Sequence, residues 1–418
     1  MNVGLTVKAK GLDGIATRAE TILSRFGVAE AKTRAALDEY VKITDRAGAR
    51  PTLPITAVVL SRHPRLIAAY VEQGVEFAVH GLVHRDHAST DLATQSAGIA
   101  EAAQRFADAG VPFCGFRGPY LRRSADTATV LRTLGFVYDS TQSVHFPVLE
   151  QSLRSEDSYQ RVLALYGSLP ADDHVVRPRL RGRLVDLPVA VPDDEVFVER
   201  LALMPEAQSA AWRAILHRTH QEEELFTLML HPERIFDCGA ALSDVLTEAR
   251  ALRTVWIARL DEIARWWLRR SVARIEVSAV ARDRFRATAI GESDVTLSLH
   301  RPPHGAERIP SGTSVEFFAP FRPCVGVSPA APATLVAFLQ EEGYLVERSP
   351  ARAEYAAYVE AEDESWSERD VLAKVAAAAS PVARLSRWPA GASSALAISG
   401  DIDSITLQDF LMRLWETN

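Results

Sequence analysis

Cysteine, excess basic charge and long apolar runs are all scarce in this sequence of 418 residues. Its three cysteines, Cys114, Cys238 and Cys324, are widely spaced, which excludes a disulfide framework or zinc-knuckle spacing and indicates a compartment where thiols stay reduced. The formal net charge of −7 leaves no basic footprint for nucleic acid. No window approaches the roughly 18 to 20 apolar residues of a membrane-spanning helix, and residues 1–10 lack the apolar core of a signal peptide. We therefore expect a cytoplasmic protein with neither nucleic acid nor membrane as a partner.

What the sequence contains is an alternation of short apolar runs and amphipathic stretches. Runs typical of buried strands occur at 2–7, 55–60, 75–79, 111–116, 135–139, 183–189 and 225–230. Stretches with apolar residues at helical spacing occur at 16–26, 30–47, 63–73, 91–109, 124–134, 205–223 and 241–270. This alternation predicts an α/β fold with a parallel sheet or barrel. In such barrels the functional side chains lie at the carboxyl ends of the strands.

The pattern changes from residue 271 onward, and a chain of this length is expected to form more than one domain. Residues 1–270 are predicted to form the barrel. Short runs separated by Asp, Gly and Pro predict a small β-sandwich-like module over residues 271–328, through which the chain could associate with a partner or with itself as a homo-oligomer. Residues 329–418 are predicted to be helical, with a strand at 395–400 and a final helix at 407–415 that could complete the barrel.

The strand run 75–79 ends in a pair of histidines, His80 and His84. Imidazoles four residues apart, with Gly81 relaxing the backbone between them, can face one point and hold a divalent metal. The alternative is two unrelated histidines near a surface loop. His87 lies further on, and we assign it no ligand role.

Two more chemically active side chains follow predicted strands. Arg117 opens the block Arg-Gly-Pro-Tyr that ends at Tyr120, and His231 follows the last strand run of the predicted barrel. Taken alone, Arg117 could be a surface salt-bridge partner and His231 a buried structural histidine. The acidic pair Asp193 and Asp194 is interpreted as part of a turn.

In chain order, the chemically active blocks are His80-Gly-Leu-Val-His84, Phe116-Arg-Gly-Pro-Tyr120, Val185-Asp-Leu-Pro188 and Leu228-Met-Leu-His-Pro232. With this set the sequence resembles, over about residues 30–268, the polysaccharide deacetylases, the NodB-homology family of metal-dependent amide and ester hydrolases. The stretch 250–267 also looks like the end of the domain in the allantoinase-like branch of that family.

The resemblance implies a distorted (β/α) barrel whose metal is held by one Asp and two His, with a second Asp as base and a late His as general acid. Carried over to this sequence, His80 and His84 would be metal ligands and His231 would be the acid. Arg117 would orient the catalytic carboxylate, and Tyr120 would offer a backbone N–H to the oxyanion. These roles are chemically consistent, because a carboxylate can take the proton of the attacking water while preorganised donors stabilise the developing negative charge.

The sequence departs from the family pattern where the acids should stand. The family opens with a strand ending in Thr-Phe-Asp-Asp, whereas the first predicted strand here leads to Lys8 and Lys10, and a protonated lysine cannot ligate a metal. The strand run 395–400, which leads to Asp401 and Asp403, is the other stretch that looks like the missing motif. Chain ends often lie close together, so the barrel could be completed by its own tail, as in a circular permutation. We assign Asp403 to the metal and Asp401 to the base; the alternative is that both cap the following helix.

These assignments predict a metal-dependent deacetylase that hydrolyses a carbon–nitrogen (non-peptide) amide bond, most simply removing an N-acetyl group from a sugar or sugar-like intracellular substrate. Zinc is the default metal for two His and one Asp, although Mn, Co and Ni are also compatible. A small acylated sugar or specialised metabolite fits a cytoplasmic enzyme better than a cell-wall polymer. Two alternatives stay open: an allantoinase-like hydrolase of another C–N bond, and a metal-free barrel that acts as a binding or scaffold protein, which Lys8 and Lys10 would favour.

Overall fold

The computed structural model describes residues 25–302, 305–361, 363 and 365–417. The chain divides into two compact units. The first contains the described residues up to Ala171, then Val176–Ala264 and the described residues from Ala395 on; the second contains Asp172–Val175 and Arg265–Ser394. Within the described part of the chain, no helix is both long enough and apolar enough to cross a membrane. The strand predicted at 2–7, most of the helix predicted at 16–26, and Lys8 and Lys10 lie outside the described residues.

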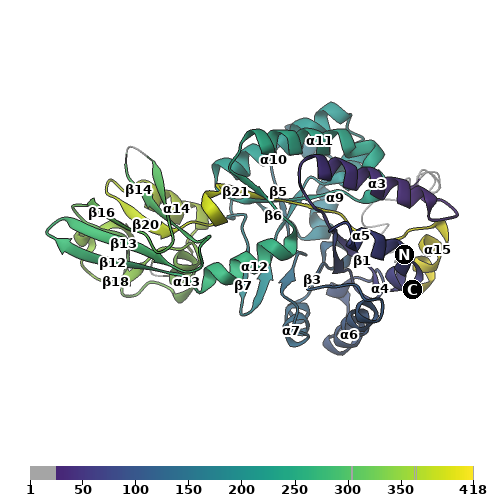
Figure 1. Ribbon diagram of the computed structural model, residues 1–418, viewed down its shortest axis with the longest axis horizontal. Helices are drawn as coiled ribbons and strands as arrows, with labels where there is room; N and C mark the ends of the chain where they lie inside the picture. The colour runs from purple at the N-terminus through teal and green to yellow at the C-terminus, as the bar shows by residue number, and fades with distance from the viewer. Residues whose placement is uncertain (1–24, 303–304, 362, 364, 418) are drawn as a thin grey trace. The chain divides into compact units, whose positions relative to one another are not determined.

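A nine-stranded sheet, curled into an open half-barrel, forms the centre of the first unit (Figure 1). Its main path runs in the order β10 (Leu225–Met229), β21 (Ser394–Ser399), β1 (Thr52–Ile55), β2 (Glu76–Val79), β3 (Gly115–Phe116), β4 (Tyr138–Asp139), β8 (Leu184–Asp186) and β7 (Arg179–Arg181), and β11 (Val255–Ile257) pairs with β21. Neighbours from β10 to β8 are parallel, and β7 adds an antiparallel edge. All residues of β1, β2, β10 and β21 are buried, as expected for parallel strands covered on both faces. The predicted α/β class is confirmed, and the curled, mostly parallel sheet agrees with the predicted distorted (β/α) barrel.

Helices lie around this sheet, and α12 begins in the first unit and continues into the second (Figure 1). They are α3 (Ala31–Arg46), α4 (Ala57–Arg62), α5 (Pro64–Val71), α6 (Leu92–Asp108), α7 (Ala125–Thr133), α8 (Gln151–Arg154), α9 (Asp157–Tyr166), α10 (Pro205–Gln221), α11 (Ile235–Ala251), α12 (Leu260–Ser271) and α15 (Leu407–Glu416). Local signals set their starts: Pro64 occupies the first turn of α5, and the Asp91 side chain accepts a 2.8 Å hydrogen bond from Thr94 N–H at the start of α6. A small parallel sheet of β5 (Ser143–His145), β6 (Leu169–Pro170) and β9 (Val189–Val191) lies in the same unit.

Three predictions for the first unit are wrong in detail. Of the strand predicted at 55–60, only Ile55 belongs to β1; Thr56 is the N-cap residue of helix α4, and residues 57–60 lie in that helix, because a short apolar run does not distinguish a strand from a buried helix. The single helix predicted at 241–270 is two helices with β11 between them, and Arg253 interrupts the helix at φ +58°. The segment 141–182, for which the sequence predicts neither a helix nor a strand, contains α8, α9 and the short strands β5, β6 and β7.

In its described residues, the second unit contains three three-stranded sheets, helices α13 and α14, and the part of α12 from Arg265 on. The sheets are β12 (Arg274–Ala281), β13 (Arg284–Ile290) and β16 (Ser314–Phe318); β15 (Ala306–Pro310), β14 (Thr296–His300) and β20 (Val382–Leu385); and β18 (Val346–Arg348), β17 (Arg322–Val327) and β19 (Tyr355–Val359), with helices α13 (Ala333–Glu341) and α14 (Glu368–Ala376).

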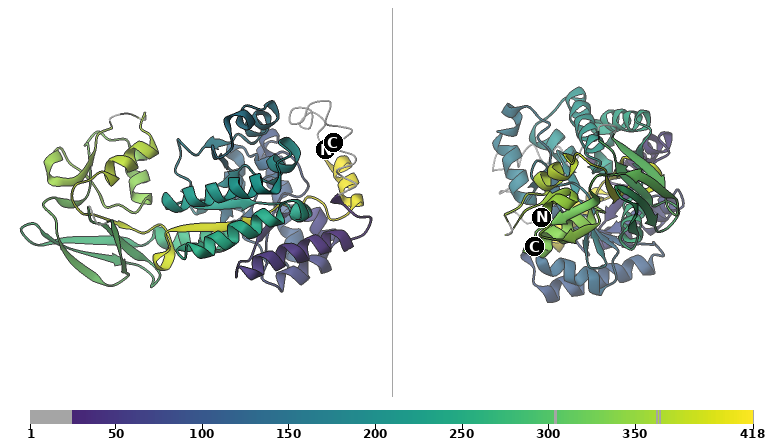
Figure 2. Two further views of the ribbon diagram at one scale, coloured as in Figure 1. Left: turned by 90° about the horizontal axis from the view of Figure 1, so that it is seen from above. Right: turned by 90° about the vertical axis from the view of Figure 1, so that its left-hand side faces the viewer.

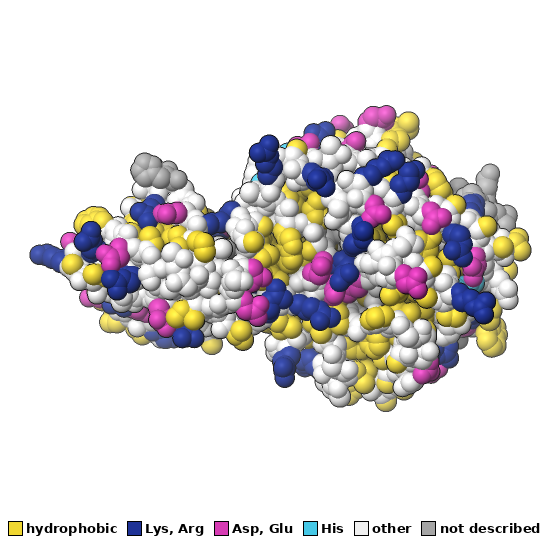
Figure 3. All heavy atoms as spheres, in the orientation of Figure 1, with side chains coloured by type: hydrophobic (Ala, Val, Ile, Leu, Met, Phe, Trp, Pro, Cys, Tyr) yellow, Lys and Arg dark blue, Asp and Glu magenta, His cyan; other side chains and the backbone are white. Residues whose placement is uncertain are grey.

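The structure divides this part of the chain differently from the predicted ranges 271–328 and 329–418. Strand β14 pairs with β20, and β17 pairs with β18 and β19, so both ranges contribute to the same sheets and one unit. The stretch predicted to be helical therefore contains three strands. The pairings join segments far apart in the chain, which local periodicity does not report. On the face drawn in Figure 3, acidic and basic side chains are interspersed.

The C-terminal strand β21 lies inside the main sheet, between β10 and β1. It pairs in parallel with β10 from Ala395 to Ser399, and Ser399 reaches Thr52 of β1. Gly400 follows, and a Cβ at this position would lie 1.8 Å from the Leu230 carbonyl oxygen, so only glycine allows this approach. The end of the chain is thereby placed beside the end of β10 and one strand away from β2.

Candidate active site

The carboxyl ends of β2 and β21 bring three potential metal ligands together. His80 and His84 follow β2, Asp403 follows β21, and one ligand atom from each lies within 4.8 Å of the others. Asp403 Oδ1 is 3.5 Å from His80 Nε2 and 3.3 Å from His84 Nε2. Ligand atoms around a tetrahedral zinc with bonds of about 2.0 to 2.2 Å lie about 3.4 Å apart. The spacing of His80, His84 and Asp403, called the trio below, therefore fits a divalent ion.

The hydrogen bonding of the trio supports the same interpretation. His80 Nδ1 lies 2.8 Å from the Arg117 carbonyl oxygen, so the ring donates its proton there and turns the Nε2 lone pair towards Asp403. His80 Nε2 and Asp403 Oδ1 are both buried and make no hydrogen bond. Buried polar atoms are rarely left without a partner, and these two point at one another. A bound cation would satisfy both.

The protonation states of His84 and Asp403 are those that metal ligands need. Burial lowers the pKa of His84 well below its ordinary value, and the Asp403 carboxylate only partly offsets this effect, so the imidazole is neutral. Burial raises the pKa of Asp403, but the positive charge of the neighbouring Arg413 opposes this effect, and the pKa lies well below the ordinary value. A neutral imidazole beside an ionised carboxylate is the donor set that divalent metals prefer.

Asp401 is held by a completely buried arginine. Arg117 Nη1 donates a 2.9 Å hydrogen bond to Asp401 Oδ1. The rest of the guanidinium is fixed by bonds to Ser140 (2.9 Å to the carbonyl and 3.0 Å to Oγ) and to Ser399 Oγ at 3.0 Å. Asp401 Oδ2 lies 3.6 Å from His80 Nε2. The second carboxylate is therefore oriented at the edge of the trio, with one oxygen on Arg117 and the other facing inward.

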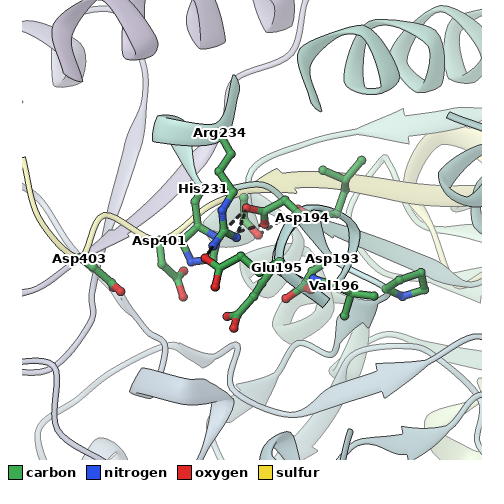
Figure 4. Close-up of polar contacts among 12 residues, drawn as sticks. Asp193, Asp194, Glu195, Val196, His231, Arg234, Asp401 and Asp403 are labelled. Carbon is green, nitrogen blue, oxygen red and sulfur yellow. Dashed lines mark hydrogen bonds and ion pairs between the residues drawn. The ribbon is translucent and has the colours of Figure 1, made fainter. Parts of the chain in front are cut away.

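His231 follows β10 and is paired with an acid from another loop. Its Nδ1 lies 3.0 Å from both carboxylate oxygens of Asp194, and Arg234 Nη1 donates a 2.6 Å bond to the same carboxylate (Figure 4). Burial lowers the pKa of His231, but the Asp194 carboxylate outweighs burial and the pKa is raised to about 10. With Nδ1 bound to Asp194, the protonated ring has Nε2–H available for proton donation.

The turn that carries Tyr120 is strained and braced. Tyr120 has φ +60°, and its ring forms a T-shaped pair with the His84 ring, with centroids 4.4 Å apart. A Cβ on Gly118 would lie 2.5 Å from the Arg122 carbonyl oxygen, so the turn requires glycine there. Gly118 N–H donates a 2.8 Å bond to Thr141 Oγ1 after β4. The turn is thus fixed against both the His84 ring and the segment after β4.

All seven residues assigned from the sequence fall at one end of the half-barrel. They are His80, His84, Arg117, Tyr120, His231, Asp401 and Asp403. Asp401 does not merely cap the following helix; the cap of α15 is Thr406. The acidic pair before α10, interpreted as a turn, has a second role that was missed, because Asp194 binds His231. A signal was available, because two adjacent acids lie four and five residues after the end of the strand predicted at 183–189.

Comparison with known proteins gives a partial match. Residues 26–138 match the family model described as Polysaccharide deacetylase. A peptidoglycan deacetylase-like protein from Gibberella zeae is 30% identical over 139 residues, which is 32% of this chain and 41% of the relative. This chain therefore matches only about two fifths of the length of that curated relative. The family match includes both histidines of the trio and ends before the two tail acids.

Among solved structures, similarity is distant. A Mycobacterium smegmatis protein described as a polysaccharide deacetylase is 24% identical, with a TM-score of 0.44, 56% of this chain covered and 77% of the other. PuuE allantoinase is 20% identical, with a TM-score of 0.44, covering 57% of this chain and 74% of the other.

Proposed function

Residues 26–138 are a polysaccharide deacetylase family domain, and on that premise we propose that the chain is a metal-dependent hydrolase that removes an N-acyl group, most simply N-acetyl, from a sugar or sugar-like substrate in the cytoplasm. The observation that carries the proposal is the meeting of Asp401 and Asp403, from the last strand, with His80 and His84, from the second. The tail supplies the two acids that the first predicted strand lacks. The presence of Lys8 and Lys10 in place of acids is therefore a weaker argument for a metal-free barrel.

His80, His84 and Asp403 would hold the ion, with zinc as the default for two imidazoles and one carboxylate. When bound, the ion would supply Lewis acidity, polarising the acyl carbonyl and making a water molecule easier to deprotonate.

Asp401 is placed to act as the general base. Arg117 neutralises part of its charge and fixes its orientation, so Oδ2 faces the position where water would attack. In the reaction, Asp401 takes a proton from water while the water oxygen forms a bond to the acyl carbon. The backbone at Tyr120, fixed in its turn, is positioned to stabilise the negative charge that develops on the acyl oxygen.

His231 is placed to act as the general acid. Asp194 holds its ring through Nδ1 and keeps the imidazole protonated near neutral pH. As the C–N bond breaks, His231 gives its proton to the departing nitrogen, and the products are the free amine and the carboxylic acid. The two proton carriers lie on neighbouring strand ends because Gly400 packs against Leu230.

The test combines metal analysis with product detection. Purified protein is expected to bind one equivalent of zinc, and a panel of N-acetylated small sugars, tested for acetate release, is expected to contain a substrate. His80→Ala should lose both metal and activity, whereas His217→Ala, a half-exposed histidine on α10, should lose neither. A protein that binds no metal under any loading condition would support a scaffold instead, and metal binding with hydrolysis confined to other C–N amides would support the allantoinase-like alternative.

A further inference from the structure

Helix α15 is the C-terminal helix drawn in yellow in Figure 2. It contacts the trio of His80, His84 and Asp403 through the side chain of Arg413. Arg413 donates a hydrogen bond from Nη1 to Asp403 Oδ2. The other oxygen of Asp403, Oδ1, makes no hydrogen bond and faces His80 Nε2 and His84 Nε2 at 3.5 and 3.3 Å. The side chains of Arg413 and Asp403 are only 13% and 17% exposed, so water screens their pairing weakly.

We propose that Arg413 is a positioning residue of the metal site, whose guanidinium occupies one oxygen of Asp403 so that only the other is presented to the ion. The inference rests on the proposed function in that the trio must hold a metal. A carboxylate on a short side chain can otherwise rotate and offer either oxygen. A charge-assisted bond to one oxygen removes this freedom, and such outer partners orient the ligands of metal sites.

For Arg413 to act in this way, α15 itself must be held in place, and its first turn is. Thr406 Oγ1 accepts a 3.2 Å bond from Asp409 N–H, while Asp409 Oδ2 accepts a 2.9 Å bond from Thr406 N–H. This reciprocal capping box fixes the start of the helix. Phe410 stacks on Phe26, with ring centroids 5.7 Å apart, and ties the same turn to the segment before α3.

Two residues at the end of α4, Arg62 and His63, together bind the first and last turns of α15. His63 Nε2 lies 2.8 Å from Asp409 Oδ2, and its Nδ1 lies 2.7 Å from Glu30 Oε1. An imidazole can donate to two carboxylates only when both nitrogens carry protons. Arg62 pairs with Asp409 at 3.3 Å and also with Glu416 in the last turn. These contacts hold α15 against the barrel at Asp409 and at Glu416, which lie before and after Arg413 on the helix.

A purely structural role for Arg413 predicts a different result from a positioning role. If Arg413 only anchored the helix, its loss would lower the melting temperature and leave the metal affinity of the folded protein unchanged. If it positions Asp403, its loss weakens metal binding by the folded protein. Metal affinity measured in a folded variant thus separates the two roles.

The experiment measures zinc affinity of the full chain by competition with a chromophoric chelator, with Co²⁺ absorption as a report on ligand geometry. Arg413→Met is expected to weaken zinc binding by about 10- to 100-fold. Arg413→Lys keeps the charge without the forked geometry and should recover part of this loss. Gln408→Met, an exposed position on the same helix, is the matched control and should bind zinc as the parent protein does.

Several results would overturn the inference. They are zinc affinity of folded Arg413→Met within twofold of the parent, an equal loss in Gln408→Met, or a parent protein that takes up no zinc. If Arg413→Met does not fold, Arg413→Lys and His63→Gln decide: both should weaken zinc binding while still folded, and unchanged affinity in both counts against the inference. Zinc binding that depends on Arg413 without release of any acyl group would leave the inference intact and remove the proposed function.

Discussion

Arg117 and Asp401 are 284 positions apart in the chain, yet Arg117 Nη1 donates a 2.9 Å hydrogen bond to Asp401 Oδ1 in the interior. The arginine belongs to the family-matched segment, and the aspartate belongs to the tail. This contact joins the two parts of the site, because it orients a carboxylate that stands beside the trio without being one of its three grouped ligands.

Asp401→Asn is expected to retain metal and lose activity. The amide is nearly the same size and can still accept from Arg117, but it cannot take a proton from water. The turnover number should fall by roughly 10²- to 10⁴-fold, while bound zinc, measured by elemental analysis, stays at the parent level. Loss of zinc together with activity would instead make Asp401 a ligand and reverse the assignments of Asp401 and Asp403.

Gly400→Ala tests the close packing that places the tail acids. The new methyl group would lie 1.8 Å from the Leu230 carbonyl oxygen, which is a backbone atom and cannot rotate aside, so β21 must move. Overpacking of this kind costs about 1 to 3 kcal/mol, and the unfolding free energy from urea titration should fall by at least that amount. Activity should fall further than stability, because Asp401 moves with the strand.

A glycine elsewhere in the same unit serves as the control. Gly98 lies inside helix α6, and a Cβ added there would meet no atom within 4 Å, so Gly98→Ala should stabilise the fold by about 0.5 to 1 kcal/mol. Equal behaviour of the two variants would show that the contact between Gly400 and Leu230 does not constrain β21.

The pair of Asp194 and His231 predicts the alkaline limit of activity. The pKa of His231 is raised to about 10, so the acid keeps its proton until the pH rises through that value, and activity should decline only there. Asp194→Asn removes the carboxylate that raises the pKa, so the alkaline limb should move to lower pH. The measurement is kcat/KM against pH for both proteins, and an unmoved limb in Asp194→Asn would assign it to another group.

Glu76, at the amino end of β2, predicts a pH dependence of stability away from the site. Burial raises the pKa of Glu76 to about 8, although Tyr138 donates a 2.8 Å bond to Oε1 and Thr52 donates a 2.5 Å bond to Oε2. The folded state therefore holds this proton where the unfolded chain, with a pKa of about 4.3, has lost it. This contribution is complete below the unfolded pKa, and it is lost as pH rises from about 4.3 through about 8.

The check is urea unfolding of the parent and of Glu76→Gln at pH 6 and pH 9. The parent should lose stability between these values, and the neutral amide of Glu76→Gln should reduce that loss. An identical pH dependence in the two proteins would mean that Glu76 is not the group that titrates.

Much of the first unit could be predicted because its signals are local. The run ending at His80 becomes β2, the run at 225–230 becomes β10, and the periodic stretch at 91–109 becomes α6, each within a few residues of its predicted range. Side-chain period and apolar length report the environment of a single element. They do not distinguish a strand from a buried helix in a short run, which is why the residues after Ile55 were misassigned.

The partner of His231 could not be predicted in the same way. Asp194 follows β9 and His231 follows β10, and the bond between them depends on how two loops pack. In the second unit, likewise, β14 finds its partner β20 some eighty residues later, so no local pattern could show that the two predicted ranges share a sheet.

The sequence alone determined which side chains are present and that several of them stand where strands end: two histidines, an arginine block, a late histidine and two acids in the tail. Only the tertiary structure decided that β21 enters the sheet between β10 and β1 and so brings the tail acids to the histidines. The reason is physical. The order of strands in a parallel sheet is set by long-range hydrogen bonding and by the close approach that Gly400 permits, and neither is encoded in the spacing of neighbouring residues.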